Sequence, residues 1–254
     1  HREGWWGMAA TLRDERVNDV DTRYVETALS RSGRWRGGNA VLAMNLRRER
    51  FDAALQRALG RDYSTVAYPS LAVQWTQLDD PTYPRRGRGL VVEARLGRTA
   101  FGSDVDFAQL RVEARAVRGF GADWRLLGRA ELGALTSSDD ARFPPSLRFY
   151  AGGDRSLRGY GYKDVGPRLD GTVIGGRRLA VASIELERMF TPVWGAAAFI
   201  DAGDAFDTRF ELHRGVGLGL RWRSPVGSVR VDVARGLDGP RGGLRLHLTI
   251  GPDL

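Results

Sequence analysis

The stretch Phe149-Tyr-Ala-Gly-Gly-Asp-Arg-Ser-Leu-Arg-Gly-Tyr160 is the most informative part of this chain, together with Phe199-Ile-Asp-Ala-Gly203 about 40 residues later. The first stretch is polar and rich in glycine, which indicates a loop. The second has the pattern of a strand and carries one carboxylate, Asp201. A guanidinium can donate paired hydrogen bonds to a carboxylate. The sequence therefore predicts that Arg158 fixes the loop against a wall of strands.

Period-two alternation surrounds these stretches, and helical periodicity is almost absent. Within Leu110–Ala116, the apolar residues share one face, and Arg111, Glu113 and Arg115 share the other. Leu244–Ile250 follows the same pattern near the end of the chain. Charged residues this regular would make a poor core for a β-sandwich. They favour a barrel with lipid outside and water inside.

Turn signals divide the chain into about twelve strands. The predicted spans are 4–15, 20–33, 37–51, 62–78, 87–99, 104–118, 122–136, 176–190, 193–204, 213–223, 226–236 and 241–250. We expect an all-β fold, a transmembrane antiparallel β-barrel that forms one domain over residues 1–254. The proline-rich break between Leu78 and Arg86 is expected to be a surface loop. The segment from about 137 to 175 is too long for an ordinary connection, so we expect it to have a function.

Composition excludes several classes of protein. The net charge is +8, but the arginines alternate with acids and apolar residues along strands, so we expect no nucleic-acid partner. The chain has no cysteine and three histidines, which argues against a metal site. The glycine-rich loop lacks the Gly-Lys-Ser/Thr of a phosphate loop, and no Gly-x-Ser-x-Gly elbow is present. We therefore expect neither an enzyme nor a cofactor.

The tryptophans lie at or near the ends of predicted strands. Aromatic girdles at membrane interfaces predict this placement, although ordinary packing is the alternative. The seven are Trp5, Trp6, Trp35, Trp75, Trp124, Trp194 and Trp222.

Together these motifs resemble the bacterial surface-antigen superfamily of outer-membrane assembly and translocation barrels, the BamA/TamA-like proteins. In that family a loop folds back into the lumen and carries a Val/Leu-Arg-Gly-Phe/Tyr motif, matched here by Leu157–Tyr160. The next strand carries an inward acid, matched by Glu185, and the strand after it carries Phe-x-Asp-x-Gly, matched by Phe199–Gly203. Phe143–Gly153 is most similar to TamA-like members. These motifs lie within residues 143–254, and before them the likeness rests on the strand pattern.

The resemblance implies a set of residues that anchor the loop. They are Arg158, Gly159, Tyr160, Glu185, Phe199, Asp201 and Gly203. Loss of Arg158 would leave buried acids without their partner and cost roughly 2–4 kcal/mol of loop docking. An isolated Arg-Gly-Tyr would more often be a solvated loop, and a docked loop could also serve barrel stability alone.

The resemblance also implies a lateral gate. The terminal strand, about 241–250, would pair weakly with the first strand. Gly242, Gly243 and Gly251 would weaken or bend this edge. An incoming strand could then add to it through backbone hydrogen bonds.

The family barrel has sixteen strands, and its lumen loop lies between strands eleven and twelve. Here five predicted strands follow the loop and seven precede it. We expect about four N-terminal strands and the periplasmic POTRA domains to be absent from this chain. The alternative is an unusually small relative with twelve strands.

The resemblance places the protein in the outer membrane of a Gram-negative bacterium, where it would assist insertion or secretion of β-barrel or autotransporter-type substrates. Expected partners are outer-membrane lipid, unfolded polypeptide substrates and a periplasm-spanning protein. One alternative is a two-partner-secretion pore for an unfolded polypeptide, which would conduct ions. Another is a passive porin for small anions, which liposome swelling would reveal.

Overall fold

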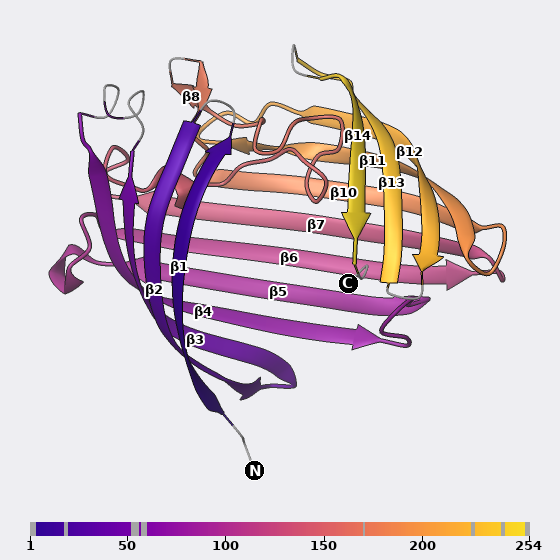
Figure 1. The fold of residues 1–254 in the computed structure, drawn as a ribbon, viewed down its shortest axis with the longest axis horizontal. Coiled ribbons are helices and arrows are strands. Elements are labelled where there is room, and N and C mark those ends of the chain that lie inside the picture. The colour runs from indigo at the N-terminus through magenta and orange to yellow at the C-terminus, as the bar shows by residue number, and fades with distance from the viewer. Residues whose placement is uncertain are drawn as a thin grey trace.

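The described part of the chain forms one large antiparallel sheet in which the strands follow one another in sequence order (Figure 1). The computed structural model describes residues 4–17, 20–51, 56, 60–169, 171–224, 227–239 and 242–251. The sheet strands are β1 (Trp5–Val17), β2 (Val20–Trp35), β3 (Gly38–Arg50), β4 (Tyr63–Leu78), β5 (Arg86–Gly97), β6 (Phe107–Phe120), β7 (Trp124–Ser137), β10 (Arg178–Met189), β11 (Trp194–Phe206), β12 (His213–Ser224), β13 (Gly227–Gly236) and β14 (Leu244–Ile250). No helix in this part of the chain is long and apolar enough to cross a membrane.

Smaller elements lie between the sheet strands. A short helix, η1 (Thr99–Phe101), follows β5, and η2 (Pro145–Leu147) follows β7. The hairpin of β8 (Arg168–Leu169) and β9 (Thr172–Val173) lies within the long connection from β7 to β10. That connection therefore contains local structure of its own, but β7 and β10 still pair directly with each other.

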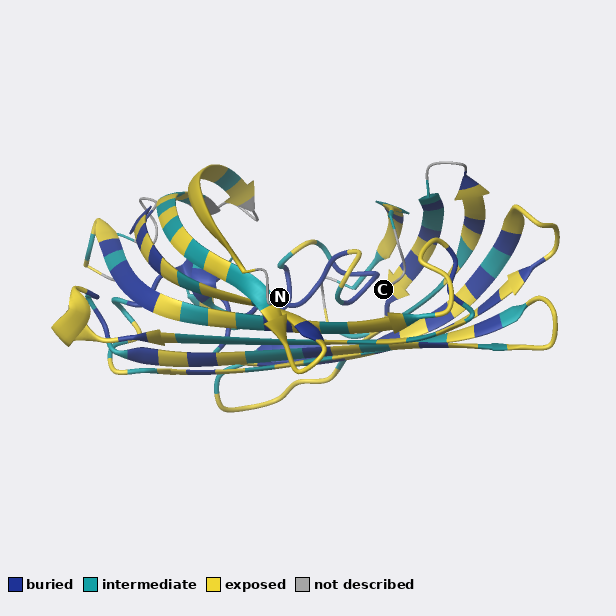
Figure 2. Cartoon of the chain, turned by 90° about the horizontal axis from the view of Figure 1, so that it is seen from below, coloured by how far each residue is buried: buried dark blue, intermediate teal, exposed yellow. Residues whose placement is uncertain are grey.

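The sheet bends into a trough, and the long connection lies inside it (Figure 2). The order of strands in the sheet runs from β1 at one edge to β14 at the other, and no described strand pairs with the outer edge of β1 or of β14. The all-β barrel wall predicted from sequence is confirmed, with every predicted strand present. The last strand is shorter than predicted: it begins at Leu244, because Gly242 and Gly243 hydrogen-bond to Gly239 and Gly159 outside the ladder.

The two faces of the wall differ as the alternation predicts. On β10, Ile184 is 57% exposed and Leu186 is 39% exposed on the outer face. Glu185 and Glu187 point to the inner face and are 5% and 1% exposed. An apolar outer face with a charged inner face is the pattern of a membrane barrel.

One part of the interior is dry, contrary to the expected water-filled lumen. There the long connection brings its own apolar side chains against the inner wall and excludes water from it. This core consists of Val66, Tyr68, Val105, Phe107, Leu135, Phe143, Leu147, Phe149, Ala151, Leu157, Tyr160, Val165, Leu179, Val181 and Ala205. Phe107 and Phe143 meet edge to face at 5.0 Å between ring centroids. Burial of this apolar surface stabilises the loop in the trough.

The two rims of the wall differ in their connections. We call the edge that carries connections 36–37, 79–85, 121–123 and 190–193 the short-turn rim, and the opposite edge, with connections 98–106, 138–177 and 207–212, the long-loop rim. Because each of the seven tryptophans lies near the start of β1, β7 or β11 or the end of β2, β4 or β12, all of them lie at the short-turn rim. The aromatic girdle expected at both interfaces is therefore built from tryptophan at one rim only.

Candidate functional site

The loop from 138 to 177 enters the trough from the long-loop rim and is held to itself before it meets the wall. Phe149 pairs with Gly176 and Ala151 pairs with Val165 in isolated bridges. The amide of Ala151 donates to the Val165 carbonyl at 3.0 Å, and the reverse bond has the same length. Arg158 lies in the segment from 151 to 165 that the inner bridge closes, at the inner face of the wall.

Arg158 uses every side-chain nitrogen on the wall. Its Nε and Nη2 donate to the two oxygens of Asp201 on β11 at 2.8 and 2.9 Å. Its Nη1 donates to Glu185 on β10 at 2.8 Å and to Asp232 on β13 at 3.0 Å. Its backbone N–H also donates to Asp201 at 3.0 Å. Bonds of this kind between charged groups are about twice as strong as neutral ones.

A second buried arginine completes the cluster. Arg221 on β12 donates to Glu185 at 2.7 Å and to Asp232 at 2.6 Å, and it is 1% exposed. The Ser183 hydroxyl donates to Asp201 at 2.5 Å. We call these six residues the ionic clasp: Arg158, Ser183, Glu185, Asp201, Arg221 and Asp232. Its three carboxylates and two guanidiniums leave few unsatisfied hydrogen-bonding positions, which burial of charge requires.

The clasp keeps Arg158 charged. Burial alone would lower the pKa of Arg158, but hydrogen bonds to Asp201 and the charges of Asp201 and Glu185 outweigh burial and raise that pKa above its usual value. The guanidinium carbon also lies 3.3 Å from the Phe199 ring centroid. The aromatic face therefore covers the cation on a side that the acids leave open.

Two glycines allow the close approach that this geometry needs. Gly159 has φ 91°, and a Cβ there would overlap the backbone nitrogen of Gly236 on β13. A Cβ on Gly203 would overlap the carbonyl oxygen of Ala180 on β10. Larger residues at either position would push loop or strand away from the wall.

Tyr160 anchors the loop next to the clasp. Its hydroxyl lies 3.0 Å from the carbonyl oxygens of Arg214 and Asp238, and it accepts a hydrogen bond from the Asp238 amide at 3.0 Å. The ring is 1% exposed and meets His213 edge to face at 5.5 Å. The structure thus brings Arg158, Gly159, Tyr160, Glu185, Phe199, Asp201 and Gly203 into one region of the inner wall.

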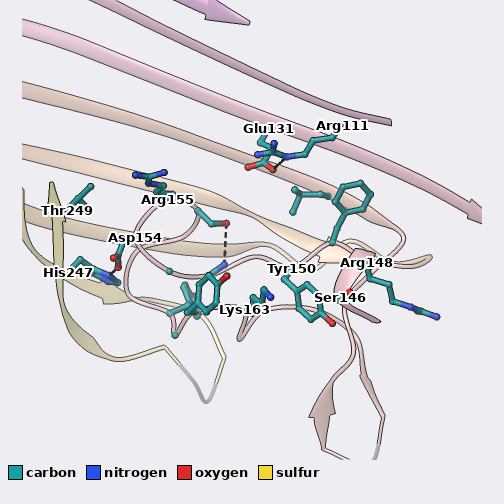
Figure 3. A pocket seen from close by; sticks show the side chains of 18 of the residues that line it. Arg111, Glu131, Ser146, Arg148, Tyr150, Asp154, Arg155, Lys163, His247 and Thr249 are labelled. Carbon is teal, nitrogen blue, oxygen red and sulfur yellow. Dashed lines mark hydrogen bonds and ion pairs between the residues drawn. The ribbon is translucent and has the colours of Figure 1, made fainter. Parts of the chain in front are cut away.

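The loop also contacts both outermost strands. The Gly159 amide donates to Nε2 of His247 on β14 at 3.1 Å, and Nδ1 of the same ring bonds to Asp154 (Figure 3). At the other side, Lys163 lies 3.5 Å from Glu15 on β1. A cavity of about 1390 Å³ lies beside the loop, and both Asp154 and His247 line it. The loop therefore spans the trough from its last strand to its first.

The glycines predicted for a lateral gate flank β14. The Gly243 amide donates to the Gly159 carbonyl at 3.4 Å, and the Gly243 carbonyl accepts from the Gly236 amide on β13 at 3.1 Å, so this segment contacts both the loop and the neighbouring strand. Gly251 donates to Ser228 at 3.0 Å after the strand ends. Their role in a gate stays a prediction.

A second segment folds inward from the short-turn rim, where the sequence predicted a surface loop. Within connection 79–85, the side chain of Tyr83 is 8% exposed, and its hydroxyl donates to Glu187 on β10. Arg125 on β7 donates to the Pro84 carbonyl at 2.9 Å and to Glu187 at 2.8 Å. We call Tyr83, Pro84, Arg125 and Glu187 the tyrosine latch. The buried pair of Glu187 and Arg125 on the inner wall offers hydrogen-bond partners to this loop, and these bonds stabilise its inward position.

The latch shares its wall with the ionic clasp. Arg221 reaches Glu187 at 3.8 Å while it binds Glu185 at 2.7 Å. Burial and the neighbouring charge of Glu187 raise the pKa of Tyr83 above its usual value, so the tyrosine stays protonated as a donor.

Sequence reasoning missed several of these residues. Asp232 and Arg221 carry a detectable signal, because each is a charged residue on the inner face of a strand with apolar neighbours. Tyr83 carries none, since an isolated tyrosine beside prolines is typical of an exposed turn. Among the described residues, no group of three or more His, Cys, Asp or Glu side chains could hold a metal ion.

The family of the chain follows from comparison with known proteins. A profile of the Omp85 superfamily domain matches residues 13–253. The chain belongs to the Omp85 superfamily. It is therefore a β-barrel protein of the bacterial outer membrane, as the resemblance implied.

Two relatives place this Omp85 chain more closely. It is 34% identical over 194 residues to the outer membrane protein assembly factor BamA of Nitratidesulfovibrio vulgaris, an overlap of 72% of this chain and 24% of that protein. BamA from Haemophilus ducreyi lacking POTRA domains 1–3 superposes with a TM-score of 0.82 at 16% identity, over 98% of this chain and 59% of that one. The chain thus spans about a quarter of its curated relative. The narrower likeness to TamA stays a prediction.

Proposed function

We propose that this chain forms part of a non-enzymatic assembly barrel that helps β-strand-rich substrates enter the outer membrane. The observation that carries the proposal is the free edge of β14, a strand of seven residues whose outer edge pairs with no described strand. An exposed strand edge offers a row of backbone donors and acceptors to any incoming strand. Outer membrane protein assembly is also the role in the name of the BamA relative.

The loop supports this proposal because it holds β14 from inside without covering its edge. His247 points into the trough toward Asp154 and Gly159, whereas Leu246 and Leu248 point to the outer face and are 70% and 59% exposed. The backbone edge of β14 is thus left free while one face of the strand is fixed. We propose the predicted anchoring residues as the support for this edge. Gly242, Gly243 and Gly251 would let its ends bend.

The finer assignment extends the same proposal. The substrates would be β-barrel or autotransporter-type polypeptides, and a periplasm-spanning protein would act as partner, as in TamA-like proteins. Against a passive porin or a polypeptide pore stands the loop, which fills part of the interior with an apolar core. Closure of the lumen that persists in Arg158→Ala would count against both pore functions.

Cross-linking in cells tests the proposal directly. The natural chain has no cysteine, so Leu246→Cys on β14 would be a single reactive site. We expect it to form adducts with barrel substrates during their assembly, and Leu132→Cys on the outer face of β7 is the matched control. Depletion of the protein followed by outer-membrane proteomics is the second test. Unchanged levels of every barrel substrate would refute the proposal.

A further inference from the structure

The outer face of the wall carries a group of arginines at the short-turn rim. Arg86 on β5 and Arg118 on β6 occupy directly opposed positions in the antiparallel register. Both are exposed and lie on the outer face, which they share with Leu90 and Leu110. Like charges that face each other across a strand pair repel and destabilise the pair.

Aromatic rings continue this group onto the next strands. Phe120 on β6 and Trp124 on β7 stack with ring centroids 6.2 Å apart. Arg188 on β10 is opposite Trp124 in the register, and its guanidinium lies 5.1 Å from the tryptophan centroid. We call Arg86, Arg118, Phe120, Trp124 and Arg188 the arginine–aromatic patch. It crosses four neighbouring strands of the wall, from β5 to β10.

No acid in the described part of the chain forms a salt bridge with Arg86, Arg118 or Arg188. Among the nearby acids, Asp79 uses its carboxylate to accept the backbone amides of Arg85 and Arg86 at 2.9 and 3.0 Å. At the long-loop rim, by contrast, Arg142 bonds Asp139 at 2.9 Å and Arg214 bonds Asp238 at 2.8 Å. The patch thus brings together three arginines that form no salt bridge within the described part of the chain.

We infer that this patch binds the headgroups of anionic phospholipids in the leaflet that borders the short-turn rim. Tryptophan and phenylalanine place the patch at the depth of the headgroups, where aromatic rings of membrane proteins gather. A lipid phosphate between Arg86 and Arg118 replaces their repulsion by two charge-assisted hydrogen bonds. Arg188, held over Trp124, reaches the same layer. The inference depends only on the outer face of the wall and is independent of the proposed assembly function.

Lipid retention by the full chain tests the inference. The protein is reconstituted with equal amounts of phosphatidylglycerol and phosphatidylcholine of identical acyl chains, and the lipids that remain bound are counted by native mass spectrometry. We expect the natural chain to prefer phosphatidylglycerol. The preference should fall by about fivefold for each arginine replaced in Arg86→Gln/Arg118→Gln/Arg188→Gln.

A matched variant separates a site from net charge. Arg142→Gln/Arg168→Gln/Arg214→Gln removes the same charge from arginines that pair with aspartates near the long-loop rim. It should keep the preference. Equal retention of the two lipids by the natural chain, or an equal loss in both triple variants, would overturn the inference.

A stability measurement guards against a folding artefact. In detergent without anionic lipid, Arg118→Gln alone should be at least as stable as the natural chain, because it removes the repulsion with Arg86. Its migration in unheated gels reports whether the barrel fold persists. A destabilised Arg118→Gln variant would show that the arginine serves packing, which contradicts the inference.

Discussion

The ionic clasp and the tyrosine latch hold two segments that enter the trough from opposite rims and end on the same strand. The clasp includes Glu185 and the latch includes Glu187, and these two acids are neighbours on the inner face of β10. The clasp fixes its loop through a charged side chain that meets acids on three strands. The latch fixes its loop through one phenol and one carbonyl, and its buried ion pair lies wholly within the wall.

This difference shows where charge is exposed when each segment leaves. Withdrawal of the 138–177 loop removes a cation from three buried carboxylates, whereas withdrawal of connection 79–85 leaves the pair of Arg125 and Glu187 intact. Breaking a buried ion pair by removal of one partner is far more costly than loss of a neutral hydrogen bond. The clasp should therefore be the firmer of the two, and the latch the one that opens more readily.

Replacement of Arg158 should have the largest effect. In Arg158→Ala, Glu185 and Asp232 keep their bonds to Arg221, whereas Asp201 loses the cation with which it forms a salt bridge, and we expect loop docking to weaken by about 3–5 kcal/mol. Hydrogen exchange followed by mass spectrometry should show faster exchange over 150–165 and little change over 79–86. Arg168→Ala, in the same loop but paired with Asp164 at 3.4 Å, is the control. If residues 150–165 of Arg158→Ala exchanged as slowly as in the natural chain, the clasp would not be the firmer of the two anchors.

Replacement of Arg221 should affect both segments at once. This arginine binds Glu185 and Asp232 and lies within 3.8 Å of Glu187, so Arg221→Gln removes charge from both sets of contacts. We expect faster exchange over 150–165 and over 79–86, with a coupling of about 0.5–3 kcal/mol in a double-mutant cycle with Tyr83→Phe. Arg178→Gln, on the exposed outer face of β10, is the control. Additive effects in the cycle would show that the two segments are independent.

The sequence predicted the wall and one of its two anchors, for physical reasons that differ. The alternation of apolar and charged residues lies within each strand, so strands such as β6 and β10 could be predicted from their own residues. Arg158, Glu185 and Asp201 could be paired through the family resemblance. The contacts of Tyr83 with Glu187 join residues 104 positions apart, and no local pattern encodes them. The dry core under the loop was missed because Phe143 and Leu147 cover the wall only after the loop has folded inward.

The latch should weaken modestly when its phenol loses the hydroxyl. Tyr83→Phe keeps the ring beside Arg125, whose guanidinium carbon lies 3.4 Å from the ring centroid, and removes only the donor to Glu187. We expect a loss of about 1–2 kcal/mol in the closure of connection 79–85. Hydrogen exchange should rise over 79–86 and stay natural over 150–165, and Thr82→Ala, on an exposed neighbour, is the control. If exchange rose equally over both regions, the latch and the clasp would open together and would not be separate anchors.

The contact between the loop and β1 should contribute least to stability, although it is the easiest to detect. Lys163 is the only lysine of the chain, and its amine lies 3.5 Å from Glu15, with the two side chains 25% and 19% exposed. A pair this open to solvent contributes about 0–1 kcal/mol, so Lys163→Gln should leave the unfolding midpoint nearly unchanged. A zero-length carbodiimide should nevertheless join Lys163 to Glu15 in the natural chain and fail in Glu15→Gln. In Arg158→Ala the cross-link should disappear with the docked loop. If it formed there as well, the loop would reach β1 without the clasp, and its packed apolar core rather than Arg158 would hold it in the trough.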